Sequence, residues 1–345
     1  MPSSPPASAP VRVAVAGCTG YIGMQCVDLV RGHPNARLTA LLGRSHAGRR
    51  FSDVVPGSPV DMQISGDLDA RGAQVVLAAL PHTVAAQHAQ RWLDEGAVVV
   101  DMSADFRLRS AADHERWYGA PHPAASLCAD AVYALVEFER EALRTADLIA
   151  VPGCYPTAVL ISTLPALRER LVTPEIIVDA KSGVSGAGRS PSMTVHFAEV
   201  NESVRAYGVE GHRHVPEMLQ QLRAAAGEDV ELTFVPHLVP MTRGILATAY
   251  LRPRPGVSAA DIANAYRSVC AAEPWLRYVD EPPPTKSVLG TNVAAVNCTA
   301  QGGVVVVTVA IDNLVKGAAG QGVQALNVRF GFAETDGLRD APSWP

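Results

Sequence analysis

An apolar run followed by three evenly spaced glycines near the N-terminus constrains the fold more than any other feature of this chain. Residues 11–16 read VRVAVA, and residues 17–23 read GCTGYIG. Glycines at this spacing between a strand and a helix are a variant of the turn that binds a dinucleotide pyrophosphate at a helix N-terminus. Gly17 would permit the tight turn, Gly20 would let the backbone approach the pyrophosphate, and Gly23 would let the helix pack on the strand. We therefore expect a dinucleotide-binding fold whose first helix spans Tyr21–Arg31.

The residues that follow keep alternating between strand and helix patterns. Apolar runs at 38–42, 75–80 and 98–102 read as buried parallel strands, and residues 84–95 have helical spacing. Alternation of this kind indicates a doubly wound α/β sheet. Residues 11–150 are therefore predicted to form an N-terminal Rossmann domain.

The end of the second strand favours NADP over NAD as the cofactor. NAD sites usually place a carboxylate there for the ribose hydroxyls, whereas this chain has Arg44 and Ser45. A cation and a hydroxyl suit the additional 2′-phosphate of NADP.

Length and composition limit the class of protein. A chain of 345 residues, 48% of them apolar, is long enough for two cores. The net charge of −5 includes no basic block for nucleic acid or an anionic membrane, and no apolar run approaches the roughly 18 residues of a spanning helix. The Pro-, Ser- and Ala-rich residues 1–10 lack the pattern of a signal peptide and are predicted to be a disordered tail.

Cysteine usage points to a reducing compartment. The six cysteines form no Cys-x-x-Cys pair, so neither a disulfide framework nor a metal site is indicated. We expect a cytoplasmic protein with no bound metal.

Cys154 is the candidate nucleophile. It follows an apolar strand, and a helix starting near Pro156 would place it beside unpaired N–H groups and the positive end of the helix dipole. Both favour the reactive thiolate. A cysteine between a strand and a helix is also common as inert packing, so its assignment depends on the rest of the site.

The segment 210–217, EGHRHVPE, supplies candidate acid–base and binding groups. One of His212 and His214 is expected to transfer protons and the other to be structural or to orient the substrate. Arg213 and Arg205 compete as candidates for binding a carboxylate of the substrate. Glu217 is a substrate-side group that orients a histidine or begins the helix 216–225.

Two further segments complete the predicted site. Arg107 suits a phosphate group on a substrate, because a guanidinium matches phosphate oxygens, although an ion pair with Asp101 or Asp105 is the alternative. The glycine-rich loop 182–189, with Ser185 and Gly186, either connects two elements or covers the nicotinamide. A cysteine, a histidine and NADP together suggest reduction of an activated acyl group through a thioester.

These motifs together resemble the N-acetyl-gamma-glutamyl-phosphate reductase family, which is related to the aspartate-semialdehyde dehydrogenases. The resemblance covers about residues 11–332, with motifs at 17–23, 101–107, 153–157, 181–189, 211–217 and 312–317. It implies that Cys154 is the nucleophile and His212 the acid–base group. It also implies that several residues lie near NADP: Thr19, Gly20, Tyr21, Ile22 and Asn313.

The resemblance also implies a reaction and an assembly. The reaction is the NADPH-dependent reduction of N-acetyl-gamma-glutamyl phosphate to the 5-semialdehyde, with release of phosphate, in arginine biosynthesis. Members of the family form homo-oligomers, usually tetramers. Two alternatives are a related reductase acting on aspartyl phosphate or on a carrier-protein-bound amino acid, and a non-catalytic NADP-sensing Rossmann protein.

Residues 151–312 are predicted to form an α+β catalytic and oligomerisation domain. Strand patterns at 176–181, 230–237, 245–252, 293–300 and 304–311 with short links suggest a mostly antiparallel sheet, with a hairpin turn at 301–303. Residues 314–329 read as a helix. By resemblance, the segment 313–332 returns to complete the cofactor domain.

Overall fold

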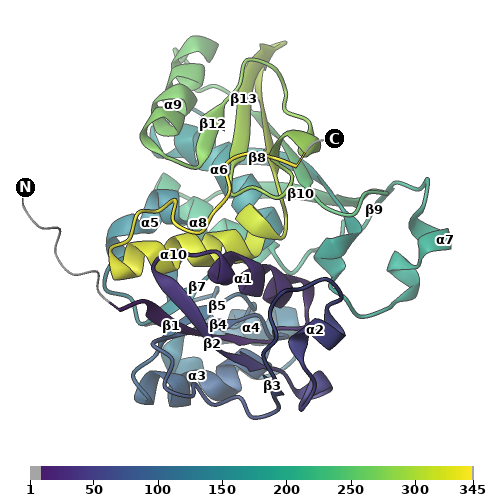
Figure 1. The fold of residues 1–345 in the computed structure, drawn as a ribbon. Coiled ribbons are helices and arrows are strands. Elements are labelled where there is room, and N and C mark those ends of the chain that lie inside the picture. Colours follow the sequence, from purple (N-terminus) through teal and green to yellow (C-terminus); the bar gives the residue numbers. More distant parts are fainter. Residues whose placement is uncertain (1–8, 344–345) are drawn as a thin grey trace, which may run out of the picture.

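The computed structural model describes residues 9–343 and folds them around two seven-stranded sheets (Figure 1). Most of the tail predicted to be disordered, residues 1–8, lies outside the described residues. Within residues 9–343, no helix combines the length and the apolar character needed to cross a membrane.

The first sheet is entirely parallel, with the strand order β3-β2-β1-β4-β5-β7-β6. Alternate side chains of its central strands enter two apolar clusters, one shared with α1 and α10 and one with α3. Coverage of both faces explains why β4, β5 and β7 are buried throughout. The predicted doubly wound architecture is confirmed. Its strands are β1 (Val11–Ala16), β2 (Ala36–Leu42), β3 (Ile64–Ser65), β4 (Val75–Ala78), β5 (Val98–Asp101), β6 (Val132–Tyr133) and β7 (Leu148–Ala150).

The glycine turn lies where the strand order of this sheet reverses, between β1 and β4. Gly17 has φ +78°, and a Cβ on it would lie 2.2 Å from the Ala79 carbonyl oxygen. A Cβ on Gly23 would lie 2.1 Å from the Gly17 carbonyl oxygen. Both positions therefore require glycine, as the sequence predicted, and α1 spans Tyr21–Arg31 as expected.

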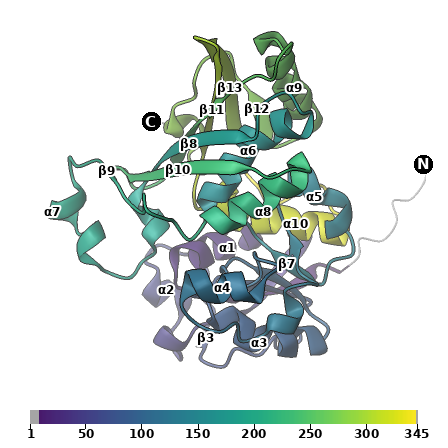
Figure 2. The same ribbon diagram turned by 180° about the vertical axis from the view of Figure 1, so that it is seen from behind.

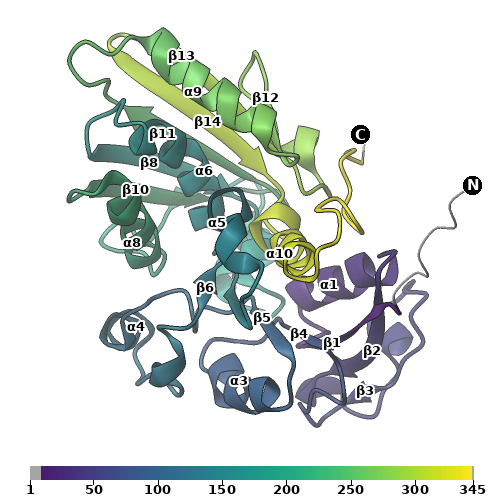
Figure 3. The same cartoon turned by 90° about the vertical axis from the view of Figure 1, so that its left-hand side faces the viewer.

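The second sheet is mixed and mostly antiparallel, with the order β12-β13-β14-β11-β8-β10-β9. The hairpin joining β13 to β14 turns at Gly302 and Gly303, as predicted. Helices α6, α8 and α9 pack on one face (Figure 3). Among residues 9–343, no α-helix packs on the opposite face, where the short 3₁₀ helix Thr285–Val288 contacts β13 and β14. The strands are β8 (Glu175–Ser182), β9 (Arg205–Ala206), β10 (Glu231–Leu238), β11 (Ile245–Leu251), β12 (Leu276–Tyr278), β13 (Ala294–Gln301) and β14 (Val304–Ile311).

The remaining α-helices follow α1 along the chain. An arm carrying α7 extends away from the body of the molecule beside β9 (Figures 1 and 2). The α-helices after α1 are α2 (Phe51–Val54), α3 (Val84–Asp94), α4 (Ala111–Tyr118), α5 (Val136–Leu143), α6 (Cys154–Arg168), α7 (Phe197–Val200), α8 (Val215–Ala226), α9 (Ala259–Ala272) and α10 (Gly320–Phe330).

The last predicted helix, 314–329, differs at its start. A π-turn, η6 (Val315–Ala319), precedes α10. The Gly317 N–H donates to the Asp312 carbonyl at 3.0 Å, five residues back, while the Asp312 carboxylate accepts from the Leu314 N–H at 2.9 Å. Helix α10 then packs on α1 and α5 of the first sheet. The domain boundaries at residues 150 and 312 remain predictions.

Candidate active site

The predicted catalytic residues lie near the carboxyl edge of the first sheet. Cys154 is the first residue of α6, directly after β7, and Gly153 is the N-cap. Helix α6 therefore starts two residues earlier than the expected start at Pro156. Cys154 is partly exposed, whereas the other five cysteines are buried, and none is paired. Exposure thus distinguishes Cys154 from every other cysteine of the chain.

A buried carboxylate, that of Glu217 on α8, holds the backbone before Cys154. Its Oε1 accepts from the Gly153 N–H at 2.9 Å and from the Tyr133 hydroxyl at 2.8 Å. Its Oε2 lies 3.5 Å from Nη1 of Arg107. Glu217 is only 1% exposed and makes no hydrogen bond to a histidine among the described residues. These contacts do not support the expected direct substrate contact and favour a positioning role.

Arg107 lies beside Glu217 and is held by two backbone carbonyls. Its Nε donates to the Val151 carbonyl at 2.8 Å and its Nη2 to the Met102 carbonyl at 3.0 Å. The alternative ion pair with Asp101 or Asp105 is wrong, because the carboxylate that faces Arg107 is that of Glu217. Nη1 is therefore the atom of Arg107 that is not committed to a backbone carbonyl.

The expectation that Cys154 is held as a thiolate is not confirmed. Burial raises the pKa of the thiol, and this outweighs the lowering by Arg107, by the Tyr155 N–H and by Arg213. The start of α6 does contribute a backbone donor, as predicted, but desolvation is the larger effect. In the ligand-free chain the balance of these effects favours the thiol over the thiolate.

The two histidines occupy different places. A Cβ on Gly153 would lie 2.7 Å from Nε2 of His214, so this buried ring lies against the backbone before Cys154. His212 is half-buried and packs edge-on against Tyr155, which follows Cys154, and against Tyr207. The two rings are 4.8 Å apart. The sequence prediction that these histidines lie beside the cysteine segment agrees with the geometry.

A backbone hydrogen bond fixes the tautomer of His212. Its Nδ1 accepts from the His214 N–H at 3.1 Å, so the neutral ring carries its proton on Nε2. Burial, followed by the charge of Arg213, lowers the pKa of His212 to about 4. At neutral pH the ring is uncharged and has one N–H to donate.

The predicted cofactor residues fall into two groups. Helix α1 begins at its N-cap Gly20 without a side-chain cap and without an acidic residue in its first turn, so its first N–H groups suit an anion. Thr19, Tyr21 and Ile22 flank this end. Arg44 and Ser45 follow β2, as predicted, and Arg44 Nη2 lies 3.3 Å from His88 Nε2.

The second group comes from the glycine-rich loop. Ser185 and Gly186 lie in a short 3₁₀ turn after β8. The Asn313 amide donates to the Ser185 hydroxyl at 3.0 Å, and its oxygen accepts from the Gly244 N–H at 2.7 Å. Both Asn313 and Ser185 are buried, so Asn313 fixes the loop in place.

The sequence predicted that the small residues at 316–320 allow a close approach to another backbone, but it did not predict the partner of that contact or the contact of Arg189. Nη1 of Arg189, at the end of the glycine-rich loop, donates to the Thr19 carbonyl at 2.9 Å and so ties the loop to the glycine turn. A Cβ on Gly317 would lie 2.8 Å from the Cβ of Cys154. The unusual glycine content of both segments was visible, but their contact partners lie far away in the sequence.

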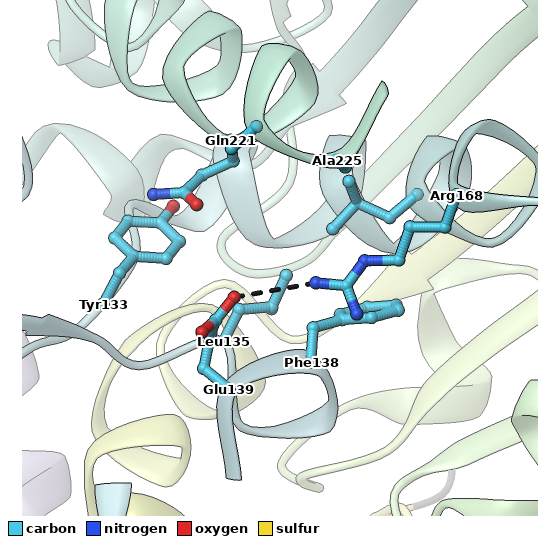
Figure 4. A pocket seen from close by; sticks show the side chains of 9 residues that line it. Tyr133, Leu135, Phe138, Glu139, Arg168, Gln221 and Ala225 are labelled. Carbon is cyan, nitrogen blue, oxygen red and sulfur yellow. Dashed lines mark ion pairs between the residues drawn. The ribbon is translucent and has the colours of Figure 1, made fainter. Parts of the chain in front are cut away.

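A pocket of about 340 Å³ lies between α5, α6 and α8 (Figure 4). Tyr133 and the ion pair of Arg168 with Glu139, 3.6 Å apart, line it. Neither Cys154 nor the two histidines belong to its wall, so it is not the reaction site. Among residues 9–343, no cluster of three or more His, Cys, Asp or Glu side chains is arranged to hold a metal ion.

Comparison with known proteins identifies the class first. Residues 12–146 match the family model "Semialdehyde dehydrogenase, NAD binding domain", and residues 154–313 match "Semialdehyde dehydrogenase, dimerisation domain". The fold is similar to aspartate semialdehyde dehydrogenase II of Vibrio cholerae, with a TM-score of 0.72 at 16% identity over 94% of this chain and 99% of that one. It is also similar to the NADP complex of the Candida albicans aspartate semialdehyde dehydrogenase, with a TM-score of 0.65 at 16% identity over 93% and 98% of the two chains. The chain is a semialdehyde dehydrogenase in fold.

Sequence relatives narrow the class to one family. N-acetyl-gamma-glutamyl-phosphate reductase of Desulforudis audaxviator is 46% identical over 95% of this chain and 98% of that protein. The reductases of Ectopseudomonas mendocina and Heliobacterium modesticaldum are 46% and 43% identical, over 97% of this chain and the full length of each relative. The chain belongs to the N-acetyl-gamma-glutamyl-phosphate reductase family, as the sequence motifs predicted.

Proposed function

We propose that this chain reduces N-acetyl-gamma-glutamyl phosphate to N-acetyl-glutamate 5-semialdehyde, with release of phosphate, in arginine biosynthesis. The observation that carries the proposal is the single partly exposed cysteine, Cys154, at the start of α6 in a chain that belongs to this reductase family. The Cys154 sulfur forms a bond to the acyl carbon, the carbon–oxygen bond to phosphate breaks, and the thiol proton leaves with the phosphate, so that a thioester and hydrogen phosphate result. A reduced nicotinamide, when bound, would supply the hydride for this thioester, and collapse of the resulting hemithioacetal at Cys154 releases the aldehyde and the free thiol.

The neighbouring side chains have distinct proposed roles. His212, with its proton on Nε2, donates a hydrogen bond to the carbonyl oxygen as negative charge develops there, and the proton that leaves with the phosphate comes from the Cys154 thiol and not from the neutral ring. Arg107 and Arg213 are the cations for the phosphate and carboxylate of the substrate. Glu217 positions Gly153 and Arg107 and does not touch the substrate.

NADP is the proposed cofactor. The start of α1, at residues 17–23, would hold its pyrophosphate, and Arg44 with Ser45 would meet the 2′-phosphate. Ser185 and Gly186, in the loop fixed by Asn313, would lie over the nicotinamide. We further propose a cytoplasmic homo-oligomer, either a dimer or a tetramer, supported by the match to a dimerisation domain and by six unpaired cysteines.

The reverse reaction tests the substrate. The chain is assayed with NADP, phosphate and one of two aldehydes, N-acetyl-glutamate semialdehyde or aspartate semialdehyde. We expect the acetylated aldehyde to give the higher kcat/KM. A preference for aspartate semialdehyde would overturn the proposal.

The variant Cys154→Ser tests the mechanism. It should lose nearly all turnover, because serine is a much weaker nucleophile at neutral pH, and it should bind NADP with the parent affinity. Cys298→Ser, at a buried cysteine of β13, is the matched control and should keep its activity. Full activity in Cys154→Ser would remove the thioester from the mechanism.

A further inference from the structure

A fully buried ion pair lies beside the segment that contacts Cys154. Nζ of Lys316 donates to Oε1 of Glu137 at 2.5 Å and to Oε1 of Gln324 at 2.9 Å. The side chains of Lys316 and Glu137 are both 0% exposed. The pair connects η6 to α5, two elements far apart in the sequence.

The ion pair lies one residue away from a glycine that packs directly on the proposed nucleophile. Lys316 precedes Gly317, and Gly317 packs on Cys154 so closely that a Cβ would lie 2.8 Å from the cysteine Cβ and 3.2 Å from its Cα. Any shift of η6 therefore moves the surface on which the cysteine side chain rests.

A contribution to folding stability does not explain why a lysine and a glutamate are buried beside η6. Removing a lysine and a glutamate from water costs several kcal/mol for each ion, and an apolar pair of similar volume is often equally stable. Oε2 of Glu137 also has no hydrogen-bond partner among the described residues. What the pair provides, and an apolar pair lacks, is a directional bond that fixes one position of the turn.

We propose that Lys316 and Glu137 are positioning residues, whose ion pair fixes η6 so that Gly317 holds the Cys154 side chain in the orientation that attacks the acyl carbon. The proposal rests on the proposed role of Cys154 as the nucleophile. Neither residue touches the substrate or the cofactor in this assignment.

The outer part of the same network offers a matched control. Arg140, also on α5, pairs with Glu334 at 2.6 Å and with Glu273. It is 25% exposed and makes no hydrogen bond to Lys316. Arg140→Met therefore removes a charged group from the network and leaves the contact of η6 with Cys154 in place.

The test is the double variant Glu137→Leu/Lys316→Met in the full chain, with kcat and KM from the reverse reaction, NADP affinity and thermal unfolding. We expect the thermal midpoint and the NADP affinity to stay close to those of the parent, and kcat to fall tenfold or more, about the effect of a misplaced reacting group. Arg140→Met should keep its kcat within twofold. If the double variant does not fold, Glu137→Gln/Lys316→Met is measured in its place.

Two outcomes separate this inference from the proposed function. A folded double variant with kcat within twofold of the parent, together with an inactive Cys154→Ser, would overturn the positioning role alone. An active Cys154→Ser would overturn the proposed function and the inference that rests on it.

Discussion

At the scale of single residues, the protonation state of Cys154 is set by opposing effects. Arg107 and Arg213 favour the thiolate, but burial is larger and raises the pKa of the thiol. A resting thiol is less exposed to adventitious oxidation than a thiolate. Ionisation is therefore expected to accompany catalysis and not to precede it.

This predicts a measurable pH dependence of alkylation. The rate of iodoacetamide reaction with the ligand-free chain should climb with pH and reach half its plateau above 9.0, the ordinary value of a thiol pKa. Mass spectrometry of the peptide that contains Cys154 measures it, and Cys154→Ser is the control, because the other five cysteines are buried. A midpoint below about 8 would show that the charges outweigh burial.

His212 should titrate far from neutrality. Burial and then Arg213 lower the pKa of its ring to about 4, below the roughly 6.5 of an unfolded histidine. Between these two pH values the unfolded chain binds more protons, so this histidine lowers the free energy of unfolding as the pH falls through that window. NMR of labelled histidine should show a pKa near 4, and a higher one in Arg213→Gln, which lacks the second cause. A parent ring titrating near 6.5 would contradict this.

At the scale of elements, the sequence predicted those helices and strands whose limits are marked by nearby residues. The first helix was correct at both ends, and the longer strands of both sheets were located to within a few residues, because apolar runs and turn residues are local signals. The short edge strands β3, β6, β9 and β12 were not predicted, because two or three residues carry no periodic pattern. The π-turn was not foreseen, since its first step depends on the Asp312 side chain and not on periodicity.

In the candidate site, too, the features that local motifs encode were predicted and those that depend on distant contacts were not. Cys154, His212 and Arg107 were found from motifs, but their supports were not. Glu217 bonds to Gly153 across 64 residues of sequence, and Lys316 bonds to Glu137 across 179. Spacing within a segment carries no information on such contacts, so only the folded chain shows them.

The contact between η6 and α6 predicts an intolerant position. Gly317→Ala would place a methyl group 2.8 Å from the Cβ of Cys154, so one of the two elements must move. We expect kcat of the reverse reaction to fall tenfold or more. Gly32→Ala, where a Cβ would meet ordinary contacts at 3.8 Å, is the matched control and should keep parent activity. Equal kcat in both variants would show that the contact is not functional.

At the scale of the whole molecule, the reaction site lies where the two sheets are joined. Helix α6 packs on the second sheet but begins at the end of β7 in the first. Arg243, which precedes β11, donates to Gln25 on α1 at 3.0 Å and to Asp312 at 3.0 Å. These hydrogen bonds connect the start of β11 in the second sheet to α1 of the first sheet and to Asp312, whose carboxylate also accepts from the Leu314 N–H before η6. Helices α1, α6 and α10 lie between the two sheets (Figure 3).

The face of the second sheet opposite α6, α8 and α9 exposes apolar side chains on β8 and β11. Along β8, buried residues alternate with residues that point to this face. Ile177 is 45% exposed and pairs with Tyr250 of β11, which is 37% exposed. Adjacent apolar side chains on an open sheet face are typical of a subunit interface. The family model that matches residues 154–313 describes a dimerisation domain.

We therefore expect Ile177→Asp to weaken self-association, because pairing two copies of the sheet would bury the new carboxylate without a partner. Light scattering coupled to gel filtration should show a concentration-dependent shift towards the mass of one chain. Gln87→Asp places the same charge on an exposed position of α3, on the first sheet, and should keep the parent mass. A parent-like mass for Ile177→Asp at every concentration would place the interface elsewhere. Because the same sheet carries α6 on its covered face, a weakened dimer that also loses turnover would link assembly to the placement of Cys154.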